Sequence, residues 1–121
     1  MPKLLIVDDE IDIREFAKRF FSKRNVNVLT ASGGQEALDI IEKEKPQLVL
    51  LDINMEEMNG LEVLQKLRLR QDTTKVIMVT GVNDENVVRE LNGLNIEGYI
   101  HKPLILEELQ TIVMAKLNEN K

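Results

Sequence analysis

The chain has 121 residues, of which 43% are apolar and 31% charged, and its formal net charge is −5. This length suits one domain that buries a core without cross-links, and the composition is typical of a globular protein rather than a disordered one. The absence of cysteine excludes disulfides and thiolate metal sites. The negative net charge disfavours direct binding to nucleic acid, which depends on neutralising phosphates.

No apolar run approaches the ~20 residues of a membrane span, and no signal-peptide core follows the N-terminus. We therefore expect a cytoplasmic protein that does not bind membranes. The densest basic stretch, Lys66, Arg68 and Arg70, lies at the end of an expected helix. Cations there complement the helix dipole, so we interpret this stretch as a solvated helix end rather than a DNA-binding patch.

Apolar runs of strand length alternate along the chain with stretches of helical periodicity. In chain order, the expected strands are 4–7, 26–30, 48–51, 76–79 and 98–101. The first expected helix carries Ile13, Phe16, Ala17 and Phe20, and the second carries Ala37, Leu38 and Ile41 after Ser32 as a cap. The third carries Leu61, Leu64 and Leu67, and a weaker fourth helix runs from Asp84 to Leu91. The last follows Pro103 and carries Ile105, Leu109, Ile112 and Val113. Repeated strand–helix units predict an α/β fold with a parallel sheet covered on both faces.

The order of the strands can also be inferred. The first, third and fourth strands are continuous apolar runs, as expected for strands buried on both faces. The second strand is interrupted by Asn27 and the fifth is short and mixed, so both are expected at the edges. Among right-handed windings that place them there, 2-1-3-4-5 is the simplest. We therefore expect a single-domain, doubly wound, five-stranded parallel sheet over residues 1–121.

Residues with distinctive chemistry follow these strands. Asp8 and Asp9 follow the first strand, Asp52 the third, Thr80 the fourth and Lys102 the fifth. The carboxyl ends of parallel strands share one edge of the sheet, where ligands bind in open α/β folds. We therefore expect one pocket that contains three carboxylates, a hydroxyl and an ammonium group.

Carboxylates gathered in this way repel one another. At ~4 Å and an effective dielectric constant of ~20, each like-charged pair costs on the order of 4 kcal/mol. Oxygen ligands without Cys or His indicate a hard cation, so Mg²⁺ is the expected cofactor and Mn²⁺ an alternative. With the cation bound, Asp52 is a candidate nucleophile that accepts a phosphoryl group, and Lys102 and Thr80 would bind other phosphoryl oxygens. Acids that only cap helices would explain Asp9 but not Asp52.

Six segments in order resemble those of response-regulator receiver domains of the chemotaxis-regulator type. They are residues 5–10, 31–38, 50–55, 58–60, 79–81 and 98–103, and the resemblance covers essentially the whole chain. It implies a flavodoxin-like (βα)5 fold and a phosphorylation-dependent signalling switch of a two-component phosphorelay. The phosphoryl donor would be a sensor histidine kinase, a histidine phosphotransfer protein or a small phosphodonor. The domain would catalyse only its own phosphorylation and dephosphorylation.

The resemblance also implies the role of each residue. Asp52 is expected to accept the phosphoryl group and, with Asp8, Asp9 and the backbone carbonyl of Asn54, to bind the metal. Thr80 and Lys102 are expected to bind phosphoryl oxygens. Thr80 and Tyr99 would form the switch, and the bond between Lys102 and Pro103 would be cis. The expected partner face, for a downstream protein or for a homodimer formed on phosphorylation, comprises Asn83, Asp84, Tyr99, His101 and Leu104.

Two alternatives stay open at this stage. One is a pseudo-receiver that acts as a phosphorylation-independent interaction module. The other is an aspartate-nucleophile phosphatase of the haloacid-dehalogenase type, although that class has a second Asp where this chain has Asn54. The sequence departs from the receiver pattern at Glu56, where proline is frequent, and Glu57 adds a second acid there. No effector domain is expected, so the chain would be a stand-alone or an excised receiver.

Overall fold

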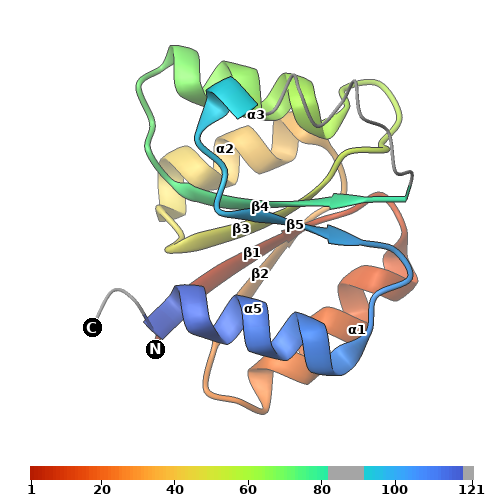
Figure 1. The fold of residues 1–121 in the computed structure, drawn as a ribbon. Coiled ribbons are helices and arrows are strands. Elements are labelled where there is room, and N and C mark those ends of the chain that lie inside the picture. Colours follow the sequence, from red (N-terminus) through yellow and green to blue (C-terminus); the bar gives the residue numbers. More distant parts are fainter. Residues whose placement is uncertain (82–91, 119–121) are drawn as a thin grey trace.

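Continuous apolar runs form the centre of a parallel sheet. The computed structural model, which describes residues 1–81 and 92–118, has a five-stranded sheet in the order β2-β1-β3-β4-β5 (Figure 1). The strands are β1 (Lys3–Val7), β2 (Asn27–Ala31), β3 (Leu48–Asp52), β4 (Lys75–Thr80) and β5 (Gly98–His101). The predicted order is confirmed, with the interrupted second strand and the short fifth strand at the edges.

The register aligns the carboxyl ends of the strands. Val7 pairs with Ala31 on one side and with Leu51 on the other. Asp52 pairs with Val79, and the residues that follow the strands therefore emerge along one edge of the sheet. This edge is where the sequence places its acids, its threonine and its lysine.

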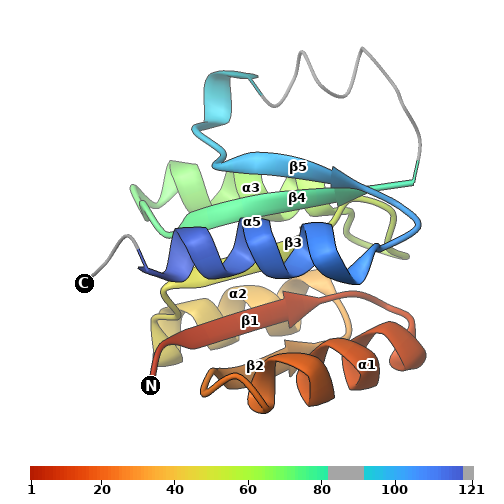
Figure 2. The same cartoon turned by 60° about the horizontal axis from the view of Figure 1, so that its bottom comes forward.

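Two layers of helices enclose the sheet. Helices α1 (Ile11–Ser22) and α5 (Leu106–Asn118) cover one face, and α2 (Gly34–Glu44) and α3 (Gly60–Leu69) cover the other (Figures 1 and 2). A short 3₁₀ helix, η1 (Asn92–Leu94), precedes β5. The expected helix from Asp84 to Leu91 lies outside the described residues. In the described part of the chain, no helix is long and apolar enough to cross a bilayer.

The buried face of α1 differs from the expected stripe. Ala17 and Phe21 are fully buried against the sheet, whereas Phe16 is 40% exposed. Phe20 lies at the boundary: its ring packs edge-on against Phe21, and the guanidinium of Arg24 sits 3.6 Å from its centroid. Periodicity could not separate the two adjacent phenylalanines, and packing with the sheet selects Phe21.

Helix ends also differ from expectation. The predicted cap at Ser32 is wrong, because Gly33 is the N-cap of α2 and makes no side-chain cap bond. Instead, the Ser32 N–H donates to Oε1 of Glu36 at 2.6 Å. At the other end of the chain, α5 begins at Leu106, and Ile105 is 52% exposed rather than part of the buried stripe.

Arg68 is not a solvated cation at a helix end. Its guanidinium donates to the carbonyls of Leu94 and Asn95, at 2.7 and 2.9 Å, and to those of Asp72 and Thr74, at 2.7 and 3.1 Å. Arg68 therefore ties the end of α3 and the loop after it to the segment that leads into β5. Hydrogen bonds to a charged group are worth about twice as much as neutral ones, so this contact is part of the fold.

Candidate functional site

Three carboxylates meet where β1 and β3 end. Asp8, Asp9 and Asp52 can each offer an oxygen such that all three atoms lie within 4.8 Å of one another. Asp52 is completely buried and Asp8 is 3% exposed, whereas Asp9 faces solvent. Of the three acids, Asp9 is therefore the one whose side chain reaches solvent. Capping does not explain Asp9, because the N-cap of α1 is Glu10.

Asp8 and Asp52 are fixed in the same way. One oxygen of each accepts a backbone N–H two residues ahead: Glu10 N–H to Asp8 Oδ1 at 2.9 Å, and Asn54 N–H to Asp52 Oδ1 at 3.1 Å. The other oxygen of each faces Nζ of Lys102, at 3.1 Å from Asp52 and 3.7 Å from Asp8. A single ammonium group therefore bridges the two buried carboxylates.

The turn after β5 directs Lys102 into the cluster. The Lys102 N–H donates to the carbonyl of Thr80 at 2.8 Å, which keeps the chain paired with β4 beyond the end of β5. The bond between Lys102 and Pro103 is cis, as predicted. The Lys102 side chain is 23% exposed, so the ammonium lies at the mouth of the cluster rather than outside it.

The electrostatics of the cluster favour a bound cation. Burial, and then the charge of Asp8, raise the pKa of Asp52 from 3.8 to about 6, against the opposing effects of the Asn54 N–H and Lys102. Burial tends to lower the pKa of Lys102, but the hydrogen bond and charge of Asp52 and the charge of Asp8 raise it overall. Near neutral pH the cluster therefore holds several charges at close range, which a divalent cation would neutralise.

The donor set fits Mg²⁺ or Mn²⁺. All three side chains offer oxygen, the atom that these hard cations prefer. Because Asp9 is exposed, a cation can reach the cluster from solvent on its side. Asn54 is exposed next to Asp52, and the role of its backbone carbonyl stays a prediction. Thr80 is 6% exposed at the end of β4, where it pairs with His101, the residue before Lys102.

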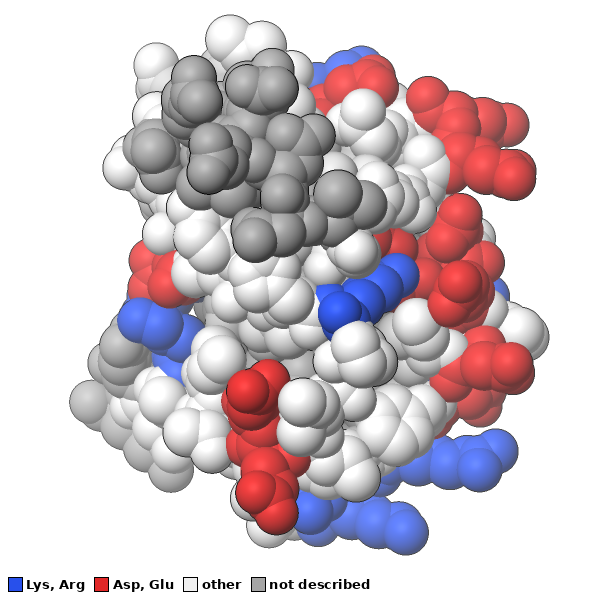
Figure 3. All heavy atoms as spheres, turned by 45° about the vertical axis from the view of Figure 1, so that its right-hand side comes forward, with Lys and Arg blue, Asp and Glu red and all other residues white. Residues whose placement is uncertain are grey.

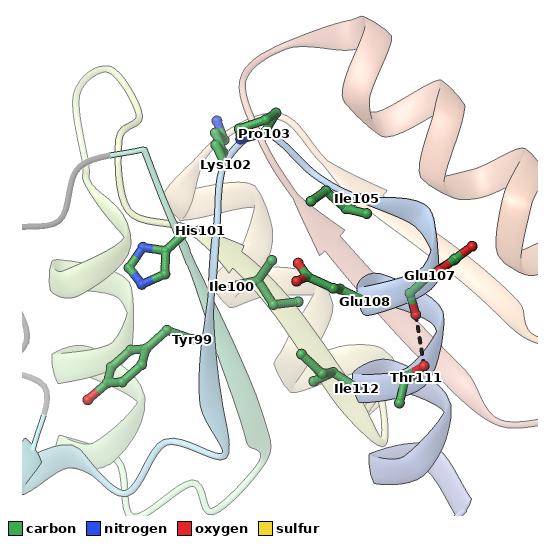
Figure 4. Close-up of a pocket in the computed structure, with 10 residues that line it drawn as sticks. All are labelled: Tyr99, Ile100, His101, Lys102, Pro103, Ile105, Glu107, Glu108, Thr111 and Ile112. Atoms are coloured by element: carbon green, nitrogen blue, oxygen red, sulfur yellow. Dashed lines mark hydrogen bonds between the residues drawn. The ribbon is translucent and has the colours of Figure 1, made fainter.

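The residues predicted for a switch and a partner face fall on two sides of β5. The side chains of Tyr99 and His101 lie on one side and Ile100 on the other, toward α5 (Figure 4). Tyr99 is half-buried against the layer of α2 and α3, and His101 is exposed. Leu104 instead packs against the layer of α1 and α5, so it does not share their side. The other two predicted residues, Asn83 and Asp84, lie outside the described residues.

Acidic side chains gather beside the cluster. Figure 3 looks onto the edge where the strands end and shows them along one side of this face. A hollow there is lined in part by Asp9, Glu36, Glu56, Glu57 and Glu62. The two acids that depart from the receiver pattern, Glu56 and Glu57, are exposed and therefore add negative charge near the open side of the cluster.

Sequence reasoning missed two residues that contact this site. Gly60, the first residue of α3, lies so close to β3 that a Cβ atom there would be 2.3 Å from the carbonyl oxygen of Asp52. Arg14 in α1 donates from Nη1 to the carbonyl of Asp8 at 2.7 Å. Gly60 belongs to a segment that supported the family resemblance, but the sequence gave no signal that linked Arg14 to Asp8.

A parallel α/β sheet with acids and a lysine at its carboxyl edge defines the class of fold and site. The family model of the response regulator receiver domain matches residues 4–114. The chain therefore belongs to the response regulator receiver domain family, whose members act in two-component systems.

Curated relatives agree with this assignment. The chain is 33% identical over 115 residues to sporulation initiation phosphotransferase F of Bacillus subtilis, with 95% of this chain and 93% of that protein covered. It is 36% identical over 121 residues to the probable transcriptional regulator ycf27 of Cyanophora paradoxa, with 98% of this chain but 49% of that protein covered. The chain thus spans nearly all of the first relative and about half of the second.

Solved structures have the same fold. A CheY-like response regulator receiver domain protein from Methanospirillum hungatei superposes with a TM-score of 0.92 at 31% identity, covering 98% of this chain and 95% of that one. The response regulator TrrA from Thermotoga maritima, in complex with Mg²⁺–BeF, superposes with a TM-score of 0.85 at 31% identity. That comparison covers 97% of this chain and all (100%) of that one.

Proposed function

We propose that this receiver domain is a phosphorylation switch in which Asp52 accepts a phosphoryl group with the help of Mg²⁺. The observation that carries the proposal is the position of Lys102 Nζ, 3.1 Å from Asp52 in a cluster of three acids. The donor is a sensor histidine kinase, a histidine phosphotransfer protein or a small phosphodonor. The domain catalyses only its own phosphorylation and dephosphorylation.

The step is an in-line displacement at phosphorus. An oxygen of ionised Asp52 forms a new P–O bond. At the same time the P–N bond of a phosphohistidine, or the P–O bond of an acyl phosphate, breaks, and its electron pair stays on the donor. Mg²⁺, held by Asp8, Asp9 and Asp52, would neutralise charge on one phosphoryl oxygen. Lys102 faces a second oxygen, and the Thr80 hydroxyl at the neighbouring strand end takes a third. Burial of Asp52 limits the access of water to the product.

The two alternatives have less support. The family match over residues 4–114 and Asn54 in place of a second Asp both disfavour a haloacid-dehalogenase-type phosphatase. A pseudo-receiver would have no need of two buried acids bridged by an ammonium group, an arrangement that costs desolvation energy for each charge. The pseudo-receiver predicts no phosphoryl adduct, so the experiment that follows separates it from the proposal.

Incubation with acetyl phosphate and MgCl₂ is expected to add one phosphoryl group to the wild-type chain, measured by intact-mass spectrometry. The adduct should be absent with EDTA and absent in Asp52→Asn, because each removes an essential part of the step. Asp39→Asn, which makes the same chemical change at an exposed position in α2, should be phosphorylated like the wild type. An adduct that persists in Asp52→Asn would contradict the assignment of the phosphoacceptor.

We also propose that a partner docks on the β5–α5 groove. This groove has a volume of about 620 Å³ and lies between Ile100 and Ile112, with Ile105 at one end and Glu107 and Glu108 along α5 (Figure 4). In the phosphorylated state this surface would bind a downstream protein or a second copy of the chain. Apolar side chains exposed beside a hollow are typical of such interfaces.

The homodimer provides a direct test of this face. The phosphorylated wild-type chain is expected to sediment as a dimer. The double variant His101→Ala, Ile105→Ser, which changes two exposed residues that line the groove, should raise the dimer dissociation constant about tenfold, the effect of ~1.4 kcal/mol. Leu69→Ser is the matched control, because Leu69 is 83% exposed on α3, away from the groove. A dimer that Leu69→Ser weakens and the double variant does not would place the interface elsewhere. A phosphorylated chain that stays monomeric would exclude the second copy.

A further inference from the structure

The backbone carbonyl of Asp8 accepts a hydrogen bond from a side chain. β1 ends at Val7, and the Asp8 N–H still continues the sheet by donating to the carbonyl of Ala31 at 3.2 Å. In the parts of the chain that the structure describes, no backbone N–H donates to the carbonyl of Asp8. Nη1 of Arg14 fills this place, at 2.7 Å. Arg14 therefore completes the backbone pairing of a residue in the acid cluster.

Arg14 acts from a helix, which makes its position well defined. It is the fourth residue of α1 and is half-buried, and Ala17 and Phe21 of the same helix pack against the sheet. The bond spans six residues, so it closes the loop that carries Asp8 and Asp9 onto the start of α1. The carboxylate of Asp9 is exposed, and its position follows from the main chain on either side of it.

We propose that Arg14 is a positioning residue that sets the geometry of the divalent-cation site by holding the main chain of Asp8. The inference rests on the proposed function, because it takes Asp8 and Asp9 as ligands of the cation. Without Arg14 the carbonyl of Asp8 loses this donor, and the loop that carries Asp8 and Asp9 is no longer held to α1, so it is free to move. Such movement shifts Asp9 and loosens the distance between Asp8 and Asp52. Groups that orient metal ligands in this way commonly change metal affinity about 10- to 100-fold when they are removed.

The sign of the effect separates positioning from simple electrostatics. Arg14 carries a positive charge near a site for a cation, so the loss of its charge alone would strengthen Mg²⁺ binding. The loss of positioning weakens it. A merely structural role for Arg14 would lower the stability of the fold and leave the Mg²⁺ affinity of the folded protein unchanged. The three interpretations therefore predict three different results for one measurement.

The experiment is isothermal titration of MgCl₂ into the wild-type chain and into Arg14→Met, Arg14→Lys and Arg19→Met. We expect Arg14→Met to raise the Mg²⁺ dissociation constant about tenfold and Arg14→Lys to recover part of the loss, since an ammonium group can still donate to the carbonyl. Arg19→Met removes the same charge from an exposed position of the same helix and should change the dissociation constant less than twofold, about 0.4 kcal/mol. Urea unfolding of each variant, with EDTA, gives the fraction folded.

An Arg14→Met dissociation constant equal to or lower than that of the wild type would overturn the inference. If this variant does not fold, Arg14→Lys carries the test, and its hydrogen exchange at the Glu10 amide, which bonds to Asp8, should be faster than in the wild type. Unchanged exchange and unchanged affinity in Arg14→Lys would also overturn it. A wild-type chain that binds no Mg²⁺ would overturn the proposed function, and this inference with it, whereas normal wild-type binding with an unaffected variant overturns the inference alone.

Discussion

Asp52→Asn is expected to make the metal-free protein more stable, raising its free energy of unfolding near pH 7.5 by about 2–3 kcal/mol. Burial and the charge of Asp8 raise the pKa of Asp52 to about 6, so the carboxylate is ionised at this pH in an environment that disfavours its charge. Asparagine has the shape of the protonated acid and carries no charge. The substitution that abolishes phosphorylation should therefore strengthen the fold.

The pH dependence follows from the same pKa shift. An unfolded chain titrates Asp52 near 3.8, and the native chain near 6, so between these values the native state binds more protons. The contribution of Asp52 to stability consequently falls as the pH rises from about 4 to about 6 and stays low above that range. The stability gap between Asp52→Asn and the wild type should widen over this window and then level off.

Urea unfolding in EDTA at pH 4.5 and at pH 7.5 measures the gap directly. Asp39→Asn is the matched control, and it should match the wild type at both pH values because Asp39 is exposed. Mg²⁺ at ten times its dissociation constant should stabilise the wild type by about 1.4 kcal/mol and the variant by less. An Asp52→Asn protein that is less stable than the wild type at pH 7.5 without metal would contradict the prediction.

The strands and the acid cluster could be predicted because their signals are local. Each central strand is a continuous apolar run, and the residue that follows it is placed by the strand itself. Once the strands are parallel, Asp8 and Asp52 must emerge at the same edge of the sheet. The pairing of Asp52 with Val79 fixes the position of Asp52 relative to the end of β4. The geometry of the site thus follows from pattern and topology together.

Other features depend on contacts between distant segments, which no local pattern records. The choice of Phe21 over Phe20 is made by the sheet beneath α1. Arg68 reaches carbonyls 26 and 27 residues further along the chain, so it could not be distinguished from a solvated helix end. Arg14 is close to Asp8 in sequence, but only the path of the loop brings its guanidinium back to that carbonyl.

Gly60→Ala is expected to lower the free energy of unfolding by about 2 kcal/mol, within the usual range for overpacking. A Cβ atom at this position would lie 2.3 Å from the carbonyl oxygen of Asp52 and 2.9 Å from Cα of Ile53. Both are backbone atoms, so α3 must move away from β3 and weaken the bond from the Gly60 N–H to the carbonyl of Ile53, now 3.0 Å long. The better helix propensity of alanine offsets only about 0.5–1 kcal/mol of this cost.

The same movement should slow the chemistry, because the main chain that shifts is that of the phosphoacceptor. We expect the rate of phosphorylation by acetyl phosphate to fall about 10- to 100-fold, as displacements of about 1 Å do in other active sites. Leu67→Ala, a fully buried change in the same helix, should cost as much stability without slowing phosphorylation of the folded protein. Gly93→Ala, where a Cβ atom meets nothing within 4 Å, should affect neither. If Gly60→Ala and Leu67→Ala slowed the reaction equally, the contact between α3 and Asp52 would matter only for folding. A larger effect of Gly60→Ala on the rate would show that the start of α3 positions the phosphoacceptor.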